Sequence, residues 1–209
     1  MGGLETTSIA SIWIMAELLR NSRVLKKAQD EVRRVVGTKG KVEMQDIIQM
    51  SYLKCIVKET LRLHPPGPLL APRETAAKVQ VGGYEIPAKT SVLVNAWAIQ
   101  RQPDSWDNPE EFIPERFEEK PVDFNGQDLR LIPFGFGRRR CPGMAFALAS
   151  IECLIANLLY WFDWKIPEGD GLPEDMDMTE EFKLSLHKQV PLHVVPIQFF
   201  PLTSFLYRQ

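Results

Sequence analysis

One cysteine lies where the residue types and their spacing most favour chemistry. Cys141 follows the glycines and arginines of residues 134–140 and precedes a long apolar segment. Pro142 suits the first turn of a helix, so we expect Cys141 at a helix N-terminus, where free N–H groups and the helix dipole favour a thiolate. Such a thiolate is either a nucleophile or a metal ligand. An inert buried cysteine is the ordinary alternative, but it explains neither the three adjacent arginines nor the glycines.

A second group of reactive side chains lies at the start of the chain. Glu5 and Thr6 follow Gly2 and Gly3. An acid beside a hydroxyl, on a helix loosened by glycine, can relay protons or hold a water molecule. The ordinary alternative is that Thr6 or Thr7 caps the helix while Glu5 lies in its first turn. The residues by themselves favour capping.

Two oppositely charged residues share one predicted helix face. Glu59 and Arg62 are three positions apart, a spacing that brings side chains together on a helix. An exposed salt bridge with little effect on stability is the ordinary interpretation. The three histidines, His64, His187 and His193, are too scattered for a metal site, and we expect each in a loop or a strand.

The composition fits one domain with a substantial core. The chain has 209 residues, of which 44% are hydrophobic, and a net charge of −2 from 25 basic and 27 acidic residues. This balance argues against nucleic-acid binding, despite the local arginines. Cys55, Cys141 and Cys153 lack C-x-x-C spacing, which argues against a disulfide framework and a zinc site. We therefore expect reduced thiols in a cytosol-facing location.

Apolar periodicity predicts helices over much of the chain. The expected helices cover residues 4–20, 24–36, 42–50, 51–64 and 142–162. Ser51 is expected to cap the fourth helix, and the prolines after His64 end it. The last helix is apolar enough to invite a transmembrane interpretation, but Glu152 at its centre favours a core helix. Cys153 and Leu154 are then expected in the core.

The β-structure is expected to be small. Residues 78–86 predict a hairpin, residues 90–96 a strand, and residues 183–195 a closing strand pair. Residues 104–127 are rich in proline and polar residues and predict an irregular meander, while residues 163–182 predict an acidic loop. The chain therefore reads as one mostly helical unit with a small sheet.

The cysteine segment also matches a known motif at every fixed position. The pattern F-x-x-G-x-R-x-C-x-G resembles the haem-binding loop of the cytochrome P-450 haem-thiolate monooxygenases. Its fixed residues are Phe134, Gly137, Arg139, Cys141 and Gly143. The resemblance implies that Cys141 is the axial iron ligand of haem b and that Arg139 binds a haem propionate. Arg138 and Arg140 would then face outward, either as an ordinary solvated surface or as a docking surface for an acidic electron donor.

Two further segments follow the family's order. The stretch Gly2–Thr7 resembles the oxygen-activation segment, which implies that Glu5 and Thr6 deliver protons to dioxygen. Pro114–Phe117 resembles the family's P-E-R-F element, which implies a buried triad of Glu59, Arg62 and Arg116 beneath the cofactor. That triad would support the cysteine loop without taking part in the chemistry.

The proline-rich turn and the C-terminal region resemble segments that line the cofactor and substrate sites. Arg73 matches a basic position that reaches a haem propionate, with a surface strand arginine as the equally weighted alternative. Leu69, Leu70 and Leu184 match positions that line the substrate pocket. Packing in the core is the ordinary alternative for these leucines.

The resemblance covers nearly the whole chain and implies the C-terminal part of the cytochrome P-450 fold, mainly α with a small β-sheet. We expect residues 1–209 to form a single partial domain that lacks the family's N-terminal half and membrane anchor. The motif details are similar to the plant microsomal branch, at the cytosolic face of the endoplasmic reticulum membrane. The implied reaction inserts one atom of dioxygen into a small lipophilic substrate, with electrons from a NADPH-dependent flavoprotein reductase.

Two alternatives come from other functional classes. One is a haem-thiolate isomerase or lyase that needs no electron donor, although Glu5 and Thr6 would have no use in that chemistry. The other is an inactive truncated fragment that binds haem weakly or not at all. Because the upstream helices are expected to be missing, we expect the 209 residues by themselves not to turn over substrate.

Overall fold

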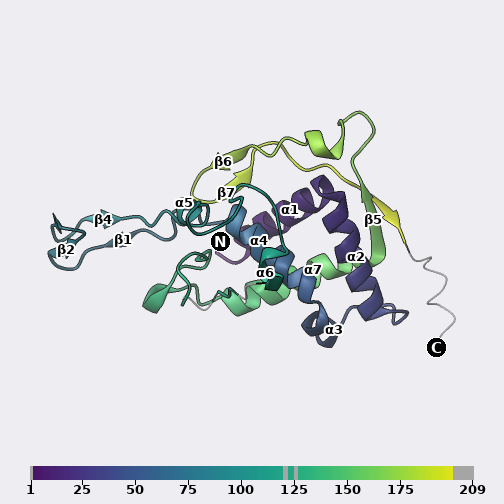
Figure 1. Ribbon diagram of the computed structural model, residues 1–209, viewed down its shortest axis with the longest axis horizontal. Coiled ribbons are helices and arrows are strands. Elements are labelled where there is room, and N and C mark those ends of the chain that lie inside the picture. The colour runs from purple at the N-terminus through teal and green to yellow at the C-terminus, as the bar shows by residue number, and fades with distance from the viewer. Residues whose placement is uncertain (1, 120–121, 125–126, 200–209) are drawn as a thin grey trace.

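Helices are the main regular structure in the computed structural model, which describes residues 2–119, 122–124 and 127–199 (Figure 1). The expectation of a mainly α fold is confirmed. The longer helices are α1 (Leu4–Arg20), α2 (Ser22–Val36), α3 (Met44–Gln49), α4 (Ser51–Leu63) and α7 (Met144–Trp161). The short helices are α5 (Ala96–Ile99) and α6 (Arg116–Glu119), with 3₁₀ turns η1 (Gly137–Arg139) and η2 (Pro173–Asp175).

Two predicted helix boundaries are wrong. The N-cap of α7 is Gly143, so Cys141 and Pro142 precede the helix instead of lying at its first turn. Ser51 is the first residue of α4 and Met50 is its N-cap, without a capping side-chain hydrogen bond. Helix ends are the least certain part of any sequence-based assignment, because one residue more or less changes little burial.

Within the residues that the structure describes, the strands form four separate antiparallel pairs. The pairs are β1 (Arg73–Glu74) with β4 (Ser91–Val92), β2 (Val79–Val81) with β3 (Tyr84–Ile86), β5 (Phe162–Lys165) with β8 (Val195–Gln198), and β6 (Glu180–Phe182) with β7 (Leu186–Lys188). The strand expected over 90–96 stops early because the Asn95 side chain caps α5 by accepting the Ala98 N–H at 2.9 Å. The partner of the last strand is β5, in a region expected to be an acidic loop.

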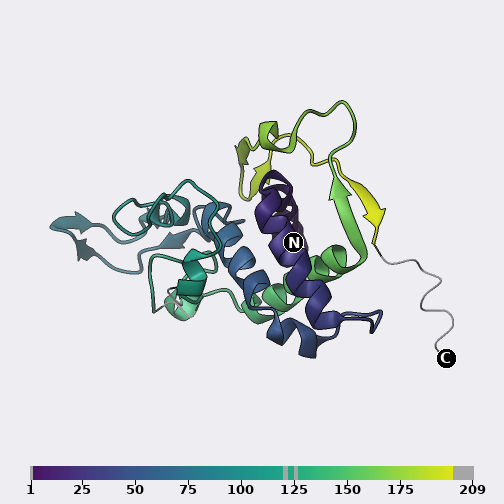
Figure 2. The same ribbon diagram turned by 45° about the vertical axis from the view of Figure 1, so that its right-hand side comes forward.

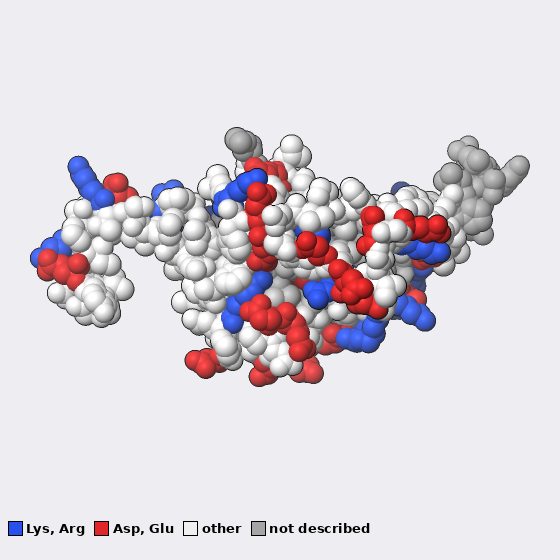
Figure 3. All heavy atoms as spheres, turned by 90° about the horizontal axis from the view of Figure 1, so that it is seen from above, with Lys and Arg blue, Asp and Glu red and all other residues white. Residues whose placement is uncertain are grey.

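The first two strand pairs form an arm that projects away from the helices (Figures 1 and 2). Its side chains are largely exposed, including Tyr84 at 78% and Val81 at 59%. The view from above shows acidic and basic side chains side by side at the tip of this arm, where Lys78 pairs with Glu85 (Figure 3). On the same face, acidic residues gather over the middle of the molecule.

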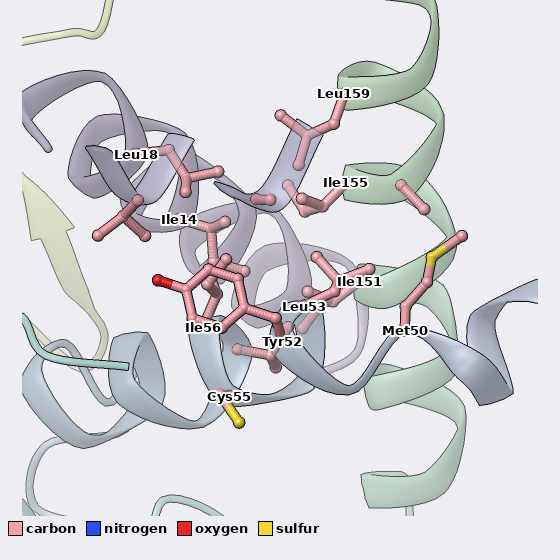
Figure 4. Packing of buried hydrophobic residues seen from close by; sticks show 14 of the residues in the cluster. Ile14, Leu18, Met50, Tyr52, Leu53, Cys55, Ile56, Ile151, Ile155 and Leu159 are labelled. Atoms are coloured by element: carbon pink, nitrogen blue, oxygen red, sulfur yellow. The ribbon is translucent and has the colours of Figure 1, made fainter. Parts of the chain in front are cut away.

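The core lies between α1, α2, α4 and α7 (Figure 4). Ile14 from α1, Leu53 and Ile56 from α4 and Ile155 from α7 are fully buried there. These apolar residues recur every three or four positions along each helix, which places them on one face. Their removal from water is the main force that brings the four helices together.

Helix α7 is buried along only part of its length. Ile151 and Ile155 lie in the core, whereas Phe146 is 77% and Leu154 is 44% exposed. The placement of Leu154 in the core is therefore wrong, and Cys153 is half-buried. By length and composition, α7 is the one helix in the described part of the chain that could cross a membrane. Core helices share these properties, and one face of α7 packs on α1 and α2.

Candidate functional site

The cysteine loop is a tight reversal closed by one backbone hydrogen bond. The N–H of Cys141 donates to the carbonyl of Phe134 at 2.9 Å, with the turn η1 between them. Gly135 and Gly137 have φ values of 70° and 67°, a left-handed backbone that favours glycine. The side chain of Cys141 is exposed at the mouth of this loop. The loop therefore presents a thiol outward while its backbone is internally bonded.

The residues around Cys141 suit a metal that arrives with most of its own ligands. Within residues 2–119, 122–124 and 127–199, no cluster of three or more His, Cys, Asp or Glu side chains could hold an ion. A single exposed thiol is the ligand that an iron already held by a porphyrin still requires. An added Cβ on Gly143 would come within 3.9 Å of the Cys141 sulfur, so glycine keeps that approach open. The loop thus fits haem.

The proline-rich turn lies directly beside this loop. The guanidinium of Arg73 stands 5.3 Å from the ring centre of Phe136. A Cβ on Gly135 would lie 3.7 Å from a methyl carbon of Leu70, so the Leu70 side chain packs against the loop at Gly135. Leu70 has a φ of 52°, an uncommon conformation for a leucine that the surrounding structure must hold in place. Arg73 and Leu70 are therefore brought to the cysteine loop, while Arg139 is exposed and Leu69 is 41% exposed.

Glu59, Arg62 and Arg116 come together in the interior. Arg62 makes a two-pronged contact with Glu59, with Nε to Oε2 at 2.7 Å and Nη2 to Oε1 at 2.9 Å. Arg116 donates from Nε to Glu59 Oε1 at 3.0 Å, and the Ile113 N–H donates to the same oxygen at 2.9 Å. Glu59 and Arg62 are fully buried, so the exposed salt-bridge interpretation is wrong for this pair.

The remaining guanidinium hydrogens are used to hold the meander. Arg62 donates to the carbonyls of Gln100, Pro109 and Glu111, and Arg116 donates to that of Asp107. Backbone carbonyls thereby share the positive charge that one carboxylate leaves uncompensated. The arrangement fastens residues 107–113 to α4.

Gln100 connects this ion cluster to the segment that enters the cysteine loop, a role that no pattern in the sequence predicts. The side chain is completely buried. Its amide nitrogen donates to the carbonyls of Leu61 and Arg62 at 3.0 Å, and its amide oxygen accepts the Ile132 N–H at 2.7 Å. This one amide group therefore pairs with two carbonyls at the end of α4 and with the N–H of Ile132, just before the cysteine loop. A lone glutamine has no periodicity or spacing that would single it out.

At the start of α1, the hydroxyls bond back into the helix. Thr6 Oγ1 donates to the Gly2 carbonyl at 2.5 Å, and Thr7 Oγ1 donates to the Gly3 carbonyl at 2.6 Å. The N-cap is Gly3, which has no side-chain bond, so the capping role considered for Thr6 or Thr7 is wrong. The Thr6 oxygen keeps lone pairs that can accept a further hydrogen bond.

Glu5 meets the turn between β6 and β7. The Ser185 hydroxyl donates to Glu5 Oε1 at 3.1 Å, and Nε2 of His187 lies 3.3 Å from the same oxygen. Leu184 is 86% exposed at the tip of this turn. The structure therefore places the residues that flank Leu184 beside the acid of α1, although the two segments are far apart in sequence.

His64 was expected to be an ordinary loop residue but is the C-cap of α4 and is buried. Its two ring nitrogens face Glu17 and Glu180. Burial would raise the pKa of Glu180, but the hydrogen bond and charge of His64 and the charge of Arg101 hold that pKa below its usual value. A histidine directly before a helix-ending proline was the available signal, but it does not predict two acidic partners.

Comparison with known proteins adds an independent line of evidence. Residues 1–193 match the family Cytochrome P450. The chain is 57% identical over 202 residues to a phenylacetaldehyde oxime monooxygenase of Prunus mume, covering 96% of this chain and 38% of that protein. It is 57% identical over 194 residues to cytochrome P450 71A1 of Persea americana, covering 93% and 38%. It is 53% identical over 197 residues to desmethylyatein synthase of Sinopodophyllum hexandrum, covering 94% and 40%.

These similarities cover nearly all of the chain, which spans about two-fifths of the length of the relatives it matches. They include the cysteine loop, the buried ion cluster and the start of α1. Members of the matched family bind haem through a cysteine thiolate. The chain therefore belongs to the cytochrome P450 family.

Proposed function

We propose that this chain carries the haem-thiolate centre of a plant monooxygenase and that Cys141 is the axial ligand. The observation that supports this proposal best is the exposed thiol of Cys141 on a loop that is closed by the hydrogen bond from the Cys141 N–H to the Phe134 carbonyl. When bound, haem supplies the activation of dioxygen and the electron-transfer chemistry. The chain's contribution is to hold that group, exclude water and move protons.

The polar residues around the loop divide into binding and proton-handling groups. Arg139 lies in the loop and Arg73 stands over Phe136, so both cations are available to bind the propionates. Glu5 is a half-buried acid in contact with a hydroxyl and an imidazole, and Thr6 offers a free lone pair one residue away. We propose that Glu5 and Thr6 hold and pass protons toward dioxygen.

The proposed substrate is a small lipophilic molecule of plant secondary metabolism. Leu70 lies beside Gly135, and Leu184 precedes Ser185, which bonds to Glu5. With the exposed Leu69, these leucines supply the proposed apolar surface for the substrate. One oxygen atom enters the substrate and the other leaves as water, with electrons from a NADPH-dependent flavoprotein reductase. The proposed location is the cytosolic face of the endoplasmic reticulum membrane, as for the microsomal proteins that the motifs resemble.

A haem-thiolate isomerase or lyase is not favoured. One of the most similar proteins carries the name of a monooxygenase. The acid, hydroxyl and imidazole gathered at the start of α1 would be useful for proton delivery, which isomerisation without an electron donor does not require.

The test is a carbon monoxide difference spectrum of the natural polypeptide that contains this sequence. Cys141→Ser should abolish the absorbance band that is characteristic of thiolate ligation. Cys153→Ser is the matched control, because Cys153 is half-buried on α7 and hydrogen-bonds to Asn157 instead of facing the loop. Survival of the band in the Cys141 variant would refute the assignment.

A further inference from the structure

A buried histidine makes two short contacts with acids from distant parts of the chain. His64 is 6% exposed at the end of α4. Its Nε2 lies 2.8 Å from Oε1 of Glu17 on α1, and its Nδ1 lies 2.7 Å from Oε1 of Glu180 on β6. The imidazole also stacks on the indole of Trp13, with ring centres 3.9 Å apart and planes within 3°. The ring is therefore held on one face and at both nitrogens.

Both acids also have other donors. Arg101 Nη2 lies 3.2 Å from Glu180 Oε1, and the indole nitrogen of Trp97 donates to Glu180 Oε2 at 2.8 Å. Asn21 donates from Nδ2 to Glu17 Oε2 at 3.2 Å. At Glu180, donors at both oxygens are the setting of an ionised carboxylate. Glu17 has His64 at one oxygen and Asn21 at the other, which suits the same form.

The two carboxylate partners bear on the form of His64. An ionised carboxylate has no hydrogen to donate, so each ring nitrogen that bonds to one must carry its own hydrogen. Only the imidazolium form of His64 donates to both carboxylates at once. In this form, His64 and Arg101 are two cations beside the carboxylates of Glu17 and Glu180, so the buried charges balance. Glu110, the other acid that contacts Arg101, lies outside this balance because its side chain is 69% exposed.

This cluster lies at the base of the turn that reaches Glu5. Glu180 begins β6, and the turn of residues 183–185 joins β6 to β7. On the far side of the turn, the Leu186 N–H donates to the Pro66 carbonyl at 3.0 Å, and the Trp13 indole donates to the Leu186 carbonyl at 3.0 Å. The hairpin is thus fixed to the end of α4 on one strand and to α1 on the other, with the His64–Trp13 stack between them.

We propose that His64 is a positioning residue whose imidazolium, clamped between Glu17 and Glu180, holds the turn of residues 183–185 against Glu5 and thereby orients the bound substrate. The first part concerns the chain alone. The last step rests on the proposed function, because it assumes that Leu184 contacts substrate. In this role His64 does not touch the reacting atoms.

General stabilisation is the competing explanation. A histidine that merely stabilised the fold would, when replaced, loosen the core helices and the hairpin together. A positioning residue should loosen the hairpin selectively, because its contact to Glu180 holds β6, whereas Ile155 is packed in the core between α1, α2, α4 and α7.

The first measurement is the hydrogen content of the His64 ring. In the wild-type chain with ¹⁵N-labelled histidine, both ring nitrogens of His64 should show a directly bonded hydrogen at neutral pH. A signal from only one nitrogen would overturn the clamp. This measurement needs no variant, so it decides the first part of the proposal even if every substitution at position 64 prevents folding.

The second measurement is amide hydrogen exchange in His64→Phe, which keeps a ring against Trp13 but removes both donors. We expect exchange at the Leu186 amide to be at least about tenfold faster, while the Ile155 amide changes little. His64→Gln retains a donor for one acid and should give an intermediate rate. His193→Phe is the control, because its side chain is 70% exposed. Equal acceleration at both amides, or none, would overturn selective positioning.

The last arm uses the natural polypeptide that contains this sequence. His64→Phe should leave the carbon monoxide band unchanged and shift the ratio of oxidation products from one substrate by at least about threefold, the range expected for a displaced contact. An unchanged product ratio with a loosened hairpin would overturn the substrate step alone. Absence of the band in the wild-type protein would instead refute the proposed function and leave the two measurements on the chain standing.

Discussion

The ion cluster around Glu59 and the loop around Cys141 are connected through Gln100, yet they expose their polar atoms very differently. Glu59 and Arg62 are fully buried, and the guanidinium of Arg62 bonds to the carboxylate and to three backbone carbonyls. Cys141 is exposed, and its N–H forms the hydrogen bond that closes the loop. The Glu59 cluster is therefore suited to stabilising the fold, and the Cys141 loop is suited to presenting a reactive group.

The difference shows how the molecule separates stability from reactivity. A buried charge is tolerated only when every partner is present, which makes the cluster rigid and costly to disturb. An exposed thiol contributes little to folding, so it remains reachable by a cofactor. Gln100 transmits the rigidity of the first region to the second, because it bonds to the end of α4 and to Ile132 at the start of the loop.

The largest expected effect is at the buried cluster. Arg62→Ala leaves Glu59 charged and buried with only Arg116 and one backbone N–H, which typically costs about 3–5 kcal/mol of the free energy of unfolding. Urea denaturation of the wild-type protein and of the Arg62→Ala variant measures this loss of stability.

The matched control removes an arginine from the surface. Arg23 pairs with Glu115, but its side chain is 72% exposed, so Arg23→Ala should cost less than about 1 kcal/mol. If the two variants lost similar stability, the contrast between buried and exposed pairs would be broken.

Much of this contrast could be predicted from the sequence, because it depends on local spacing and motif order. Helical spacing places Glu59 and Arg62 on one face, and the position of Arg116 in a P-E-R-F element suggested the third member. The helices and the hairpin at 78–86 also follow from apolar periodicity and turn residues. The helices, the hairpin and the Glu59–Arg62 pair depend on residues that are close in sequence, whereas Arg116 lies 57 positions from Glu59 and was implied only by the family resemblance.

The parts that could not be predicted depend on contacts across the chain. Gln100 bonds to residues more than thirty positions away, and His64 bonds to acids on α1 and β6. Neither contact leaves a periodic pattern. The exposure of Leu154 was missed for a related reason, because periodicity shows that a helix is apolar but not which of its faces has a neighbour.

A smaller effect, with a pH dependence, is expected one residue before Arg116. Burial alone would raise the pKa of Glu115, but hydrogen bonds from Arg23, from backbone and from Tyr52 bring it to about 2. Since this pKa is depressed on folding, the stability it contributes is present above the unfolded value of 4.5 and is lost as the pH falls toward about 2. Glu115→Gln should therefore cost roughly 1 kcal/mol at neutral pH.

Urea denaturation from neutral pH down to about pH 3 measures this dependence. The difference between wild type and Glu115→Gln should shrink steadily as the pH is lowered. A difference that stayed constant would mean that the Glu115 charge contributes nothing and that the substitution acts through packing.

The smallest effect on stability is expected at Cys141. Cys141→Ser should change the free energy of unfolding by less than about 0.5 kcal/mol, as for most exposed positions. Cys55→Ser is the matched buried change, because Cys55 is 6% exposed and burying a hydroxyl in place of a thiol typically costs about 1–3 kcal/mol. Burial also raises the pKa of Cys55 to about 11, so its thiol should react slowly with alkylating reagents while Cys141 reacts first. Peptide mapping of partially alkylated protein identifies the order. Two results would contradict this expectation: alkylation of Cys141 no faster than that of Cys55, or an equal loss of stability in the two serine variants. Either result would mean that Cys141 behaves as a buried structural residue, and the contrast with the Glu59 cluster would no longer hold.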